Sequence, residues 1–324
     1  MKAIIPVAGI GTRLRPHTLI TPKVLINVGG KSIIDHIVER LISAGVDEIA
    51  FIIGYKGEMI KDHITKNFSI KTDFYYQEEM KGIAHAVYQA KDYLKNEKVF
   101  IILGDTIYEA DLKPVFDSKY TSLGVLEVDD PRRFGIAELD ENGFVIRVEE
   151  KPEHPKTKLT LVGMYFVNEG FILKEAIEEL FKINKKTKGE YQITDTFQIM
   201  IDNGYKLRTF MIDGWYDCGK TETIIETNRY LISNLNSYPE IPGSLIKPPV
   251  LIGKSCEIKN SIIGQNVTIS DNCKIINSII KNTIIGKNTT ILNSNISSSI
   301  IGDFVKIEEK EKTFNICDYT EIKP

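Results

Sequence analysis

The N-terminal segment reads Lys2-Ala3-Ile4-Ile5-Pro6-Val7-Ala8-Gly9-Ile10-Gly11-Thr12-Arg13-Leu14-Arg15-Pro16, and Pro22-Lys23-Val24-Leu25 follows it closely. Its apolar start predicts a buried strand, and its glycines predict a turn in which backbone N–H groups approach phosphate oxygens. Arg13, Arg15 and Lys23 add positive charge at the same place. The segment lacks the Gly-x-x-Gly of a dinucleotide-binding fingerprint and the Gly-Lys-Ser/Thr of a P-loop. We predict that it holds a nucleoside triphosphate; a plain connection between strand and loop is the alternative.

Downstream of this segment, short apolar strands alternate with amphipathic helices. We predict strands at residues 2–8, 48–53, 74–77 and 99–103, and helices at 33–44, 57–67 and 83–94. This alternation is typical of an α/β fold with a mostly parallel, mixed sheet that helices cover on both faces. Ligands bind such sheets beyond the carboxyl ends of the strands, where the glycine loop, Gln77 and Asp105 fall.

Further strands and helices complete the first part of the chain. We predict strands at 123–127, 135–139, 144–150, 162–167 and 207–212, and helices at 172–180, 194–203 and 221–235. We therefore expect a first domain at residues 1–235. Residues 236–249 are rich in Pro, Ser, Asn and Gly, which predicts a linker.

Residues 250–324 carry a different pattern, which we assign to a second domain. An amphipathic helix would need apolar residues three and four positions apart. Here the aliphatic residues are five or six positions apart, and small polar residues lie between them. The pattern is typical of the hexapeptide repeat of a left-handed parallel β-helix, in which each hexad forms one side of a triangular coil. Aliphatic residues recur every five or six positions, at Ile252, Ile258, Ile263, Ile269, Ile275, Ile280, Ile285, Ile291, Ile296, Ile301 and Ile307.

The composition narrows the possible functions. The 324 residues have a formal net charge of -3, which provides no basic field for nucleic acid. No apolar run approaches the ~20 residues that span a bilayer, and no secretory signal pattern begins the chain. The four cysteines form no Cys-x-x-Cys pair, which fits a reducing compartment and argues against structural zinc. We expect a cytoplasmic protein without nucleic-acid or membrane partners, and the open faces of a β-helix favour a homo-oligomer.

Two aspartates each follow an apolar strand, Asp105 in Leu103-Gly104-Asp105 and Asp217 in Trp215-Tyr216-Asp217. Taken singly, each carboxylate suits the cap of a helix or turn. Together with a cationic glycine loop, the pair favours one Mg²⁺ that keeps water or phosphate in its remaining positions.

Two further groups suit a nucleotide and a sugar phosphate. In Glu149-Glu150-Lys151-Pro152 the lysine suits a phosphate and Glu150 suits sugar hydroxyls, with a solvated charge pair as the alternative. The Gln77 side chain offers both a donor and an acceptor to the edge of a pyrimidine, and Gly82 lets backbone approach the ring. We expect His85 to be structural.

Five ordered blocks resemble the sugar-1-phosphate nucleotidylyltransferases, over nearly all of residues 1–235. They are Gly9-Ile10-Gly11-Thr12-Arg13-Leu14-Arg15-Pro16 with Pro22-Lys23, Gly104-Asp105, Glu150-Lys151-Pro152, Gly189-Glu190-Tyr191-Gln192-Ile193-Thr194-Asp195 and Trp215-Tyr216-Asp217-Cys218-Gly219. The fourth block and the layout with a C-terminal repeat resemble the long glucose-1-phosphate thymidylyltransferases. The resemblance implies a Rossmann-like domain in which a sugar 1-phosphate attacks the α-phosphorus of an NTP in line, giving an NDP-sugar and pyrophosphate.

The resemblance also implies roles for individual residues. Arg13 would hold the triphosphate, Lys23 would neutralise charge at the α-phosphate, and Lys151 would grip the sugar phosphate. Asp105 and Asp217 would bind Mg²⁺. Positioning and charge neutralisation then suffice, with no covalent intermediate. The nucleotide would contact Ala8, Gly9, Gly11, Thr12, Arg13, Gln77 and Gly82, and the sugar phosphate would contact Gly135, Glu150, Lys151, Gly163 and Tyr165.

The base and the role of the repeat stay open at this point. Gln77 and Gly82-Ile83-Ala84-His85-Ala86 resemble thymidylyl members, whereas Pro6-Val7-Ala8-Gly9 resembles UDP-glucose pyrophosphorylases. We expect dTTP and glucose 1-phosphate, with a UTP-dependent enzyme as the alternative. Some bifunctional relatives use such a repeat to transfer an acetyl group with a histidine base, but residues 246–324 contain no histidine. We expect a packing and assembly role for the repeat; a non-catalytic regulatory homologue is a further alternative.

Overall fold

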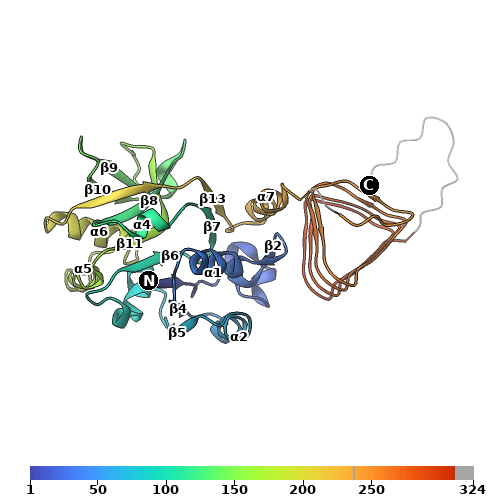
Figure 1. Cartoon of the computed structure of the whole chain (residues 1–324), viewed down its shortest axis with the longest axis horizontal. Coiled ribbons are helices and arrows are strands. Elements are labelled where there is room, and N and C mark those ends of the chain that lie inside the picture. Colours follow the sequence, from blue (N-terminus) through green and yellow to red (C-terminus); the bar gives the residue numbers. More distant parts are fainter. Residues whose placement is uncertain (236–237, 311–324) are drawn as a thin grey trace. The chain divides into compact units, whose positions relative to one another are not determined.

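The computed structural model describes residues 1–235 and 238–310 (Figure 1). Contacts divide the chain into two compact units, one of residues 1–26 and 31–224 and one of residues 27–30 and 225 onward. Helix α7 (Thr221–Ile232) runs through the second boundary. No helix in the described ranges is long and apolar enough to cross a membrane. The domain limits drawn from the sequence, 1–235 and 250–324 with a linker between them, stay a prediction.

The first unit is built on a mixed sheet, which confirms the predicted α/β fold. β1 pairs in parallel with β4 and β6, whereas β11 runs antiparallel to both β6 and β8. β4 also pairs in parallel with β5, so a parallel segment surrounds β1, and the predicted glycine loop follows this strand; a further parallel pair, β8 with β12, lies elsewhere in the sheet. The nine strands lie in the order β5 (Lys71–Tyr76), β4 (Glu48–Ile53), β1 (Lys2–Pro6), β6 (Val99–Ile102), β11 (Leu159–Val167), β8 (Thr121–Glu127), β12 (Leu207–Met211), β10 (Val145–Glu150) and β9 (Gly135–Leu139).

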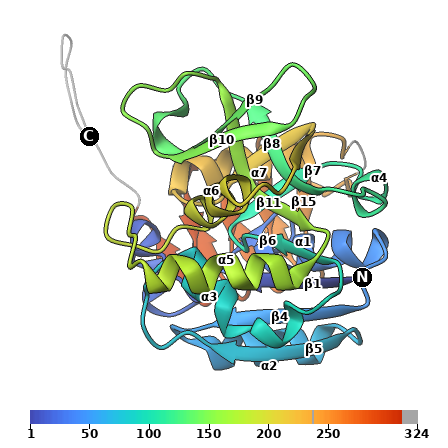
Figure 2. The ribbon, with the colours of Figure 1, turned by 90° about the vertical axis from the view of Figure 1, so that its left-hand side faces the viewer.

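Helix α1 (Ile33–Ser43) shows how the sequence sets these elements. Ser32 Oγ accepts a hydrogen bond from Asp35 N, and the Asp35 carboxylate accepts one from Ser32 N, so a capping box begins the helix. Its apolar residues recur at helical spacing, and all of them except Ile42 are fully buried. Figure 2 shows α5 in front of the sheet with α3 beside it. The other helices of this unit are α2 (Gly57–Asn67), α3 (Ile83–Gln89), α4 (Lys113–Phe116), α5 (Gly170–Lys182) and α6 (Ile193–Asp202).

Several predicted element boundaries shift by one to three residues, and two larger differences concern residues 83–94 and 105–109. The helix predicted over residues 83–94 ends at Gln89, because Ala90 leaves helical geometry, and a 3-10 turn follows at Lys91–Tyr93. No strand was predicted directly after Asp105, yet β7 (Thr106–Glu109) forms there. Its partner is β13 (Gly214–Asp217), more than a hundred residues along the chain, so local spacing could not reveal the pair.

The second unit consists of three stacked parallel sheets, the arrangement of a β-helix, which Figure 1 shows as a triangular coil. The isoleucines that recur every five or six positions, from Ile252 to Ile307, pack together in one core, whereas neighbours such as Ile262 and Ile279 are exposed. The predicted repeat is confirmed, and its left-handed sense stays a prediction. The first strand, Leu245–Ile246, lies in the predicted linker. The sheets contain β14 (Leu245–Ile246), β17 (Ile262–Ile263), β20 (Ile279–Lys281) and β23 (Asn295–Ser297); β15 (Val250–Ile252), β18 (Val267–Ile269), β21 (Ile284–Ile285) and β24 (Ile300–Ile301); and β16 (Glu257–Lys259), β19 (Lys274–Ile276), β22 (Thr290–Leu292) and β25 (Lys306–Glu308).

The corners of this coil explain the recurring asparagines. A tight corner needs a residue in the left-handed region of backbone conformation, which asparagine tolerates better than most residues with a side chain. The asparagines with positive φ are Asn260, Asn266, Asn272, Asn277, Asn282, Asn288 and Asn293. The small polar residues between the isoleucines are therefore structural.

Candidate active site

A cleft of about 1090 Å³ opens beside the sheet of the first unit, and a smaller pocket of about 230 Å³ shares part of its lining. Asp105 lines both. Of the residues proposed from the sequence, the cleft contains Arg13, Asp105, Gly135, Glu150, Lys151, Gly163, Tyr165 and Asp217. The pocket contains Ala8, Gly9, Lys23, Gln77, Gly82 and Asp105.

Gly11 and Thr12 line neither cavity. Gly11 has a φ of +69°, and a Cβ atom there would lie 3.0 Å from Lys23 Cβ, so the loop needs glycine at this position. Its carbonyl accepts a hydrogen bond from Thr18 Oγ1. Thr12 begins the short 3-10 turn Thr12–Leu14. These two residues shape the loop that carries Arg13.

Lys23 and Asp105 form a tight ion pair at the junction of the two cavities. Lys23 is buried, and its Nζ lies 2.7 Å from Asp105 Oδ2. Burial alone would raise the pKa of the Asp105 carboxyl, but the Lys23 ammonium outweighs this effect and holds the pKa below its usual value. The carboxylate therefore stays ionised at neutral pH, which a metal ligand requires.

Strands β7 and β13 bring the two predicted metal ligands to neighbouring positions. Asp217 pairs with Thr106, and Cys218 N donates to Asp105 O at 3.1 Å. The described residues contain no cluster of three or more His, Cys, Asp or Glu side chains suited to a metal. Two carboxylates fit a Mg²⁺ ion whose remaining positions are taken by phosphate oxygens and water.

Gly219 marks the point where the glycine loop approaches these carboxylates. A Cβ atom on Gly219 would lie 2.8 Å from Asp217 Oδ1 and 3.2 Å from Arg13 Nη2. The Arg13 guanidinium and the Asp217 carboxylate thus face the same small space. An arginine placed beside a carboxylate that can hold a cation is well suited to a polyphosphate.

Glu150 and Lys151 lie at the other side of the cleft, at the end of β10. Lys151 Nζ lies 3.1 Å from Glu150 Oε1, and Glu150 Oε2 accepts a hydrogen bond from Thr194 Oγ1 at 2.8 Å. Lys151 has a φ of +46°, a conformation that non-glycine residues rarely adopt. Gly135 leaves room for this carboxylate, because a Cβ atom there would lie 3.1 Å from Glu150 Oε2.

A break in β11 places Gly163 and Tyr165 in the cleft wall. The pairing of β11 with β8 shifts register between Leu161 and Tyr165, which indicates a β-bulge. Gly163 has a φ of +78°, and a Cβ atom there would lie only 2.6 Å from Leu103 Cδ1. Burial and the nearby Glu150 carboxylate raise the pKa of Tyr165, so its hydroxyl keeps its proton and can donate it.

Gln77 is buried in the smaller pocket, and its amide nitrogen has two neighbours. Nε2 donates to Gly82 O at 3.2 Å and lies 3.1 Å from His85 Nδ1. Gly82 has a φ of +106°, and a Cβ atom there would lie 2.5 Å from Tyr191 O. The backbone around Gly82 is therefore closely packed, and it sets the position of the Gln77 amide.

The cleft also contains residues that we had not proposed from the sequence. Thr194 and Trp215 lie inside two of the quoted blocks, so the blocks themselves were the available signal. Trp215 Nε1 is buried and has no hydrogen-bond partner among the described residues. The remaining charged residues of the cleft are Arg132, Arg133, Glu153, Lys188 and Lys220.

Comparisons with known proteins agree with this geometry. A family model described as "Nucleotidyl transferase" matches residues 2–234. A glucose-1-phosphate thymidylyltransferase of Streptomyces griseus is 30% identical over 332 residues, which cover 98% of this chain and 86% of the relative. The UTP–glucose-1-phosphate uridylyltransferase AglF of Haloferax volcanii is 31% identical over 240 residues, covering 71% and 96%. A Bacillus anthracis structure described as a glucose-1-phosphate thymidylyltransferase superposes with a TM-score of 0.63 at 27% identity, covering 74% and 98%.

Proposed function

The chain belongs to the nucleotidyl transferase family as a sugar-1-phosphate nucleotidyltransferase, and we propose that its substrates are dTTP and glucose 1-phosphate. The products would be dTDP-glucose and pyrophosphate. The observation that carries the choice of base is the Gln77 amide. Its Nε2 is directed at Gly82 O and His85 Nδ1, and its Oε1 accepts no hydrogen bond among the described residues. This oxygen suits the ring N–H of thymine or uracil and disfavours cytosine, whose corresponding nitrogen is an acceptor.

The choice between thymine and uracil rests on two further points. A thymidylyltransferase is among the relatives that match nearly the whole chain, whereas the uridylyltransferase matches a shorter part. The lining of the pocket around Gln77 includes the apolar side chains of Val7, Ala8, Met80 and Ala86 beside its charged residues. Apolar side chains favour burial of the thymine methyl group.

The residues of the cleft would divide the reaction between them. Lys151 and Glu150 would hold the phosphate and hydroxyls of the sugar 1-phosphate, so that a phosphate oxygen faces the α-phosphorus in line. Arg13 would bind the departing pyrophosphate, and Lys23 would balance charge at the α-phosphate. Asp105 and Asp217 would hold Mg²⁺, which when bound supplies charge neutralisation for the phosphates. Since Lys23 pairs with Asp105, the same contact fixes both a cation and a metal ligand.

A pyrophosphate-release assay tests this proposal. Purified protein is incubated with glucose 1-phosphate, MgCl₂ and, in turn, dTTP, UTP, ATP, GTP or CTP, and the sugar nucleotide is identified by mass spectrometry. We expect the highest kcat/KM with dTTP and the lowest pyrimidine activity with CTP. A clearly higher kcat/KM with UTP than with dTTP would show that UTP is the nucleotide substrate. Turnover only with GTP and mannose 1-phosphate would contradict the base assignment, and no turnover with any of these pairs would contradict the substrates proposed.

We propose an assembly role for the β-helix rather than a second catalytic site. The histidine base that an acetyl transfer would use is absent from residues 246–324. Size-exclusion chromatography with light scattering, on the full chain and on variants with charged residues on the β-helix faces, would show whether these faces associate. Consumption of acetyl-CoA with an amino-sugar phosphate would contradict the assembly-only role.

A further inference from the structure

The Gln77 amide can take only one orientation in the structure. Gly82 O is a carbonyl and can only accept a hydrogen bond, so the amide nitrogen rather than the oxygen must face it. The other hydrogen of the same nitrogen then points to His85 Nδ1 at 3.1 Å. Gln77 is only 5% exposed, so the cost of leaving either hydrogen unpaired is substantial.

This arrangement sets the protonation state of His85. Nδ1 can accept from Gln77 only if it carries no proton, so the neutral ring must hold its proton on Nε2. Gln89 Nε2 lies 3.3 Å from that side of the ring and also donates to His85 O. The Nε2 of Gln89 already donates one hydrogen to His85 O, and because Gln89 is only half-buried, water can take the other hydrogen, whereas Gln77 is buried and held by Gly82. The buried contact therefore determines the tautomer.

The surroundings of His85 favour the neutral ring. Burial, and then the Lys81 ammonium, hold the pKa of His85 below its usual value, and Glu79 opposes this effect. Glu79 is itself ion-paired with Lys81. On its outer side, His85 borders a cavity of about 460 Å³ that contains no carboxylate. The titratable groups that line this cavity are Lys81, His85, Tyr88, Lys91, Lys186 and Tyr191, and Tyr88 also donates to Glu178 on α5.

We propose that His85 is a positioning residue for base selection: as a neutral imidazole it holds the Gln77 amide with its oxygen directed at the base. This inference rests on the proposed function, and it adds a residue that we had expected to be structural. When His85 gains a second proton, Nδ1 becomes a donor and faces the donor Nε2 of Gln77. Gln77 can then satisfy either Gly82 or His85 but not both, so its oxygen no longer has a fixed position. Selection against cytosine weakens as a result.

Two substitutions separate this role from simple packing. His85→Asn places an amide oxygen near the position of Nδ1, so it keeps an acceptor that does not titrate. His85→Leu places a branched apolar side chain at this position of the helix and removes the acceptor. We measure kcat and KM for dTTP, UTP and CTP with each protein from about pH 5 to about pH 8, across the range in which histidine titrates. Thermal unfolding checks that each variant is folded.

For His85→Leu we expect KM for dTTP to rise about tenfold, the effect of one lost buried hydrogen bond, with kcat within about twofold. The preference for dTTP over CTP should narrow at the same time. In the wild-type protein, KM for dTTP should rise below about pH 6, where a histidine with a lowered pKa gains its proton. In His85→Asn the rise in KM for dTTP at low pH should be smaller. Only the ionisation of the substrate phosphates, which affects the wild type and the variant equally, should remain.

Three results would overturn the inference or its premise, and they differ from one another. A folded His85→Leu variant with wild-type KM and base preference would show that His85 only packs. Identical pH profiles for the wild type and His85→Asn would show that its titration does not reach the base. A wild-type protein that is inactive with every NTP would contradict the proposed function instead, and the binding of dTTP by calorimetry would then still test whether His85 affects the base pocket.

Discussion

The two units of this chain use the left-handed backbone region for different purposes. In the β-helix this conformation recurs at regular intervals, mostly on asparagine, and each occurrence turns a corner of the coil. In the nucleotidyltransferase unit it occurs at irregular positions, and Gly82, Lys151 and Gly163 all line the cleft or its adjoining pocket. A positive φ that recurs at regular intervals therefore marks a structural turn, whereas a single residue with positive φ beside charged residues marks a candidate functional site.

The buried polar groups differ in the same way. The β-helix interior is a single column of aliphatic side chains, and its buried serines and threonines mostly bond to backbone in neighbouring coils or in their own. The other unit buries Lys23 against Asp105 and Gln77 against His85. Substitutions at these buried polar pairs should therefore change catalysis, and substitutions in the β-helix core should change stability.

The largest effect should follow from Arg13→Ala. Removal of the guanidinium should lower kcat by about 10²- to 10³-fold, because it takes away charge stabilisation of the departing pyrophosphate. Arg15→Ala is the matched control, since Arg15 belongs to the same loop but lines neither cavity. Steady-state kinetics with saturating MgCl₂ measure both. Equal losses in the two variants would mean that the loop acts through its total charge and not through Arg13.

Ile280→Ala should test the opposite side of the comparison. Ile280 is fully buried in the β-helix, so its truncation should lower the free energy of unfolding of that unit by about 3 kcal/mol. Its neighbour Ile279 is 44% exposed, and Ile279→Ala should cost much less. Urea unfolding followed by far-UV circular dichroism measures the difference. A large drop in kcat for folded Ile280→Ala would contradict the separation of stability from catalysis.

Asp217→Asn should raise the Mg²⁺ concentration needed for half-maximal activity by about 10- to 100-fold, because it removes one of the two carboxylates proposed to hold the metal. Asp213→Asn is the control, since Asp213 is exposed and lies just before β13 outside the cleft. A titration of activity with MgCl₂ at fixed dTTP measures the shift. An unchanged requirement in Asp217→Asn would remove Asp217 from the metal site.

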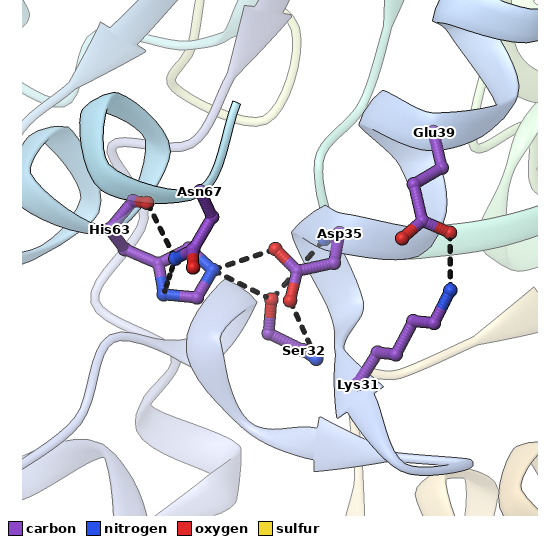
Figure 3. Close-up of polar contacts among 6 residues, drawn as sticks. All are labelled: Lys31, Ser32, Asp35, Glu39, His63 and Asn67. Atoms are coloured by element: carbon purple, nitrogen blue, oxygen red, sulfur yellow. Dashed lines mark hydrogen bonds and ion pairs between the residues drawn. The ribbon is translucent and has the colours of Figure 1, made fainter. Parts of the chain in front are cut away.

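The smallest effect concerns a polar cluster that is structural rather than catalytic (Figure 3). His63 Nε2 lies 2.6 Å from Asp35 Oδ1, and Asp35 also completes the capping box of α1 with Ser32. Although burial would raise the pKa of Asp35, hydrogen bonds from His63 and Ser32 hold it below its usual value. The ionised carboxylate therefore stabilises the fold above the unfolded-state pKa, and this contribution is lost as the pH falls through the lower folded-state pKa.

Asp35→Asn should accordingly cost about 1 kcal/mol of unfolding free energy at neutral pH and progressively less in acid. The control is Lys31→Met, which removes an exposed pair with Glu39 that Figure 3 also shows. That pair should contribute almost nothing at any pH. Urea denaturation at about pH 7 and about pH 3.5, on either side of the carboxyl titration, measures both variants. A difference between Asp35→Asn and wild type that is independent of pH would assign the effect to packing.

Much of this organisation was accessible from sequence patterns. The recurring isoleucines of residues 250–310 predicted the β-helix, since a repeat with a fixed period has few structural solutions. The glycine loop and Asp105 were predicted to lie together because they follow β1 and β6, parallel strands whose carboxyl ends meet at one edge, whereas Asp217 reaches the cleft through the antiparallel pair of β7 and β13. The pairing of β7 with β13 was missed because the two strands lie far apart in the chain, and the end of α3 at Gln89 was missed as well.

The sequence by itself determined which chemical groups are present and which ends of the sheet carry them. The tertiary structure alone decided their pairing. Lys23 pairs with Asp105, which lies 82 residues away in the sequence. Nδ1 of His85 contacts the amide nitrogen of Gln77, and the positive φ of Gly82 turns the backbone between these two residues. Hydrogen bonds have direction and a buried donor needs its own acceptor, so the role of each of these side chains follows from its neighbours in space.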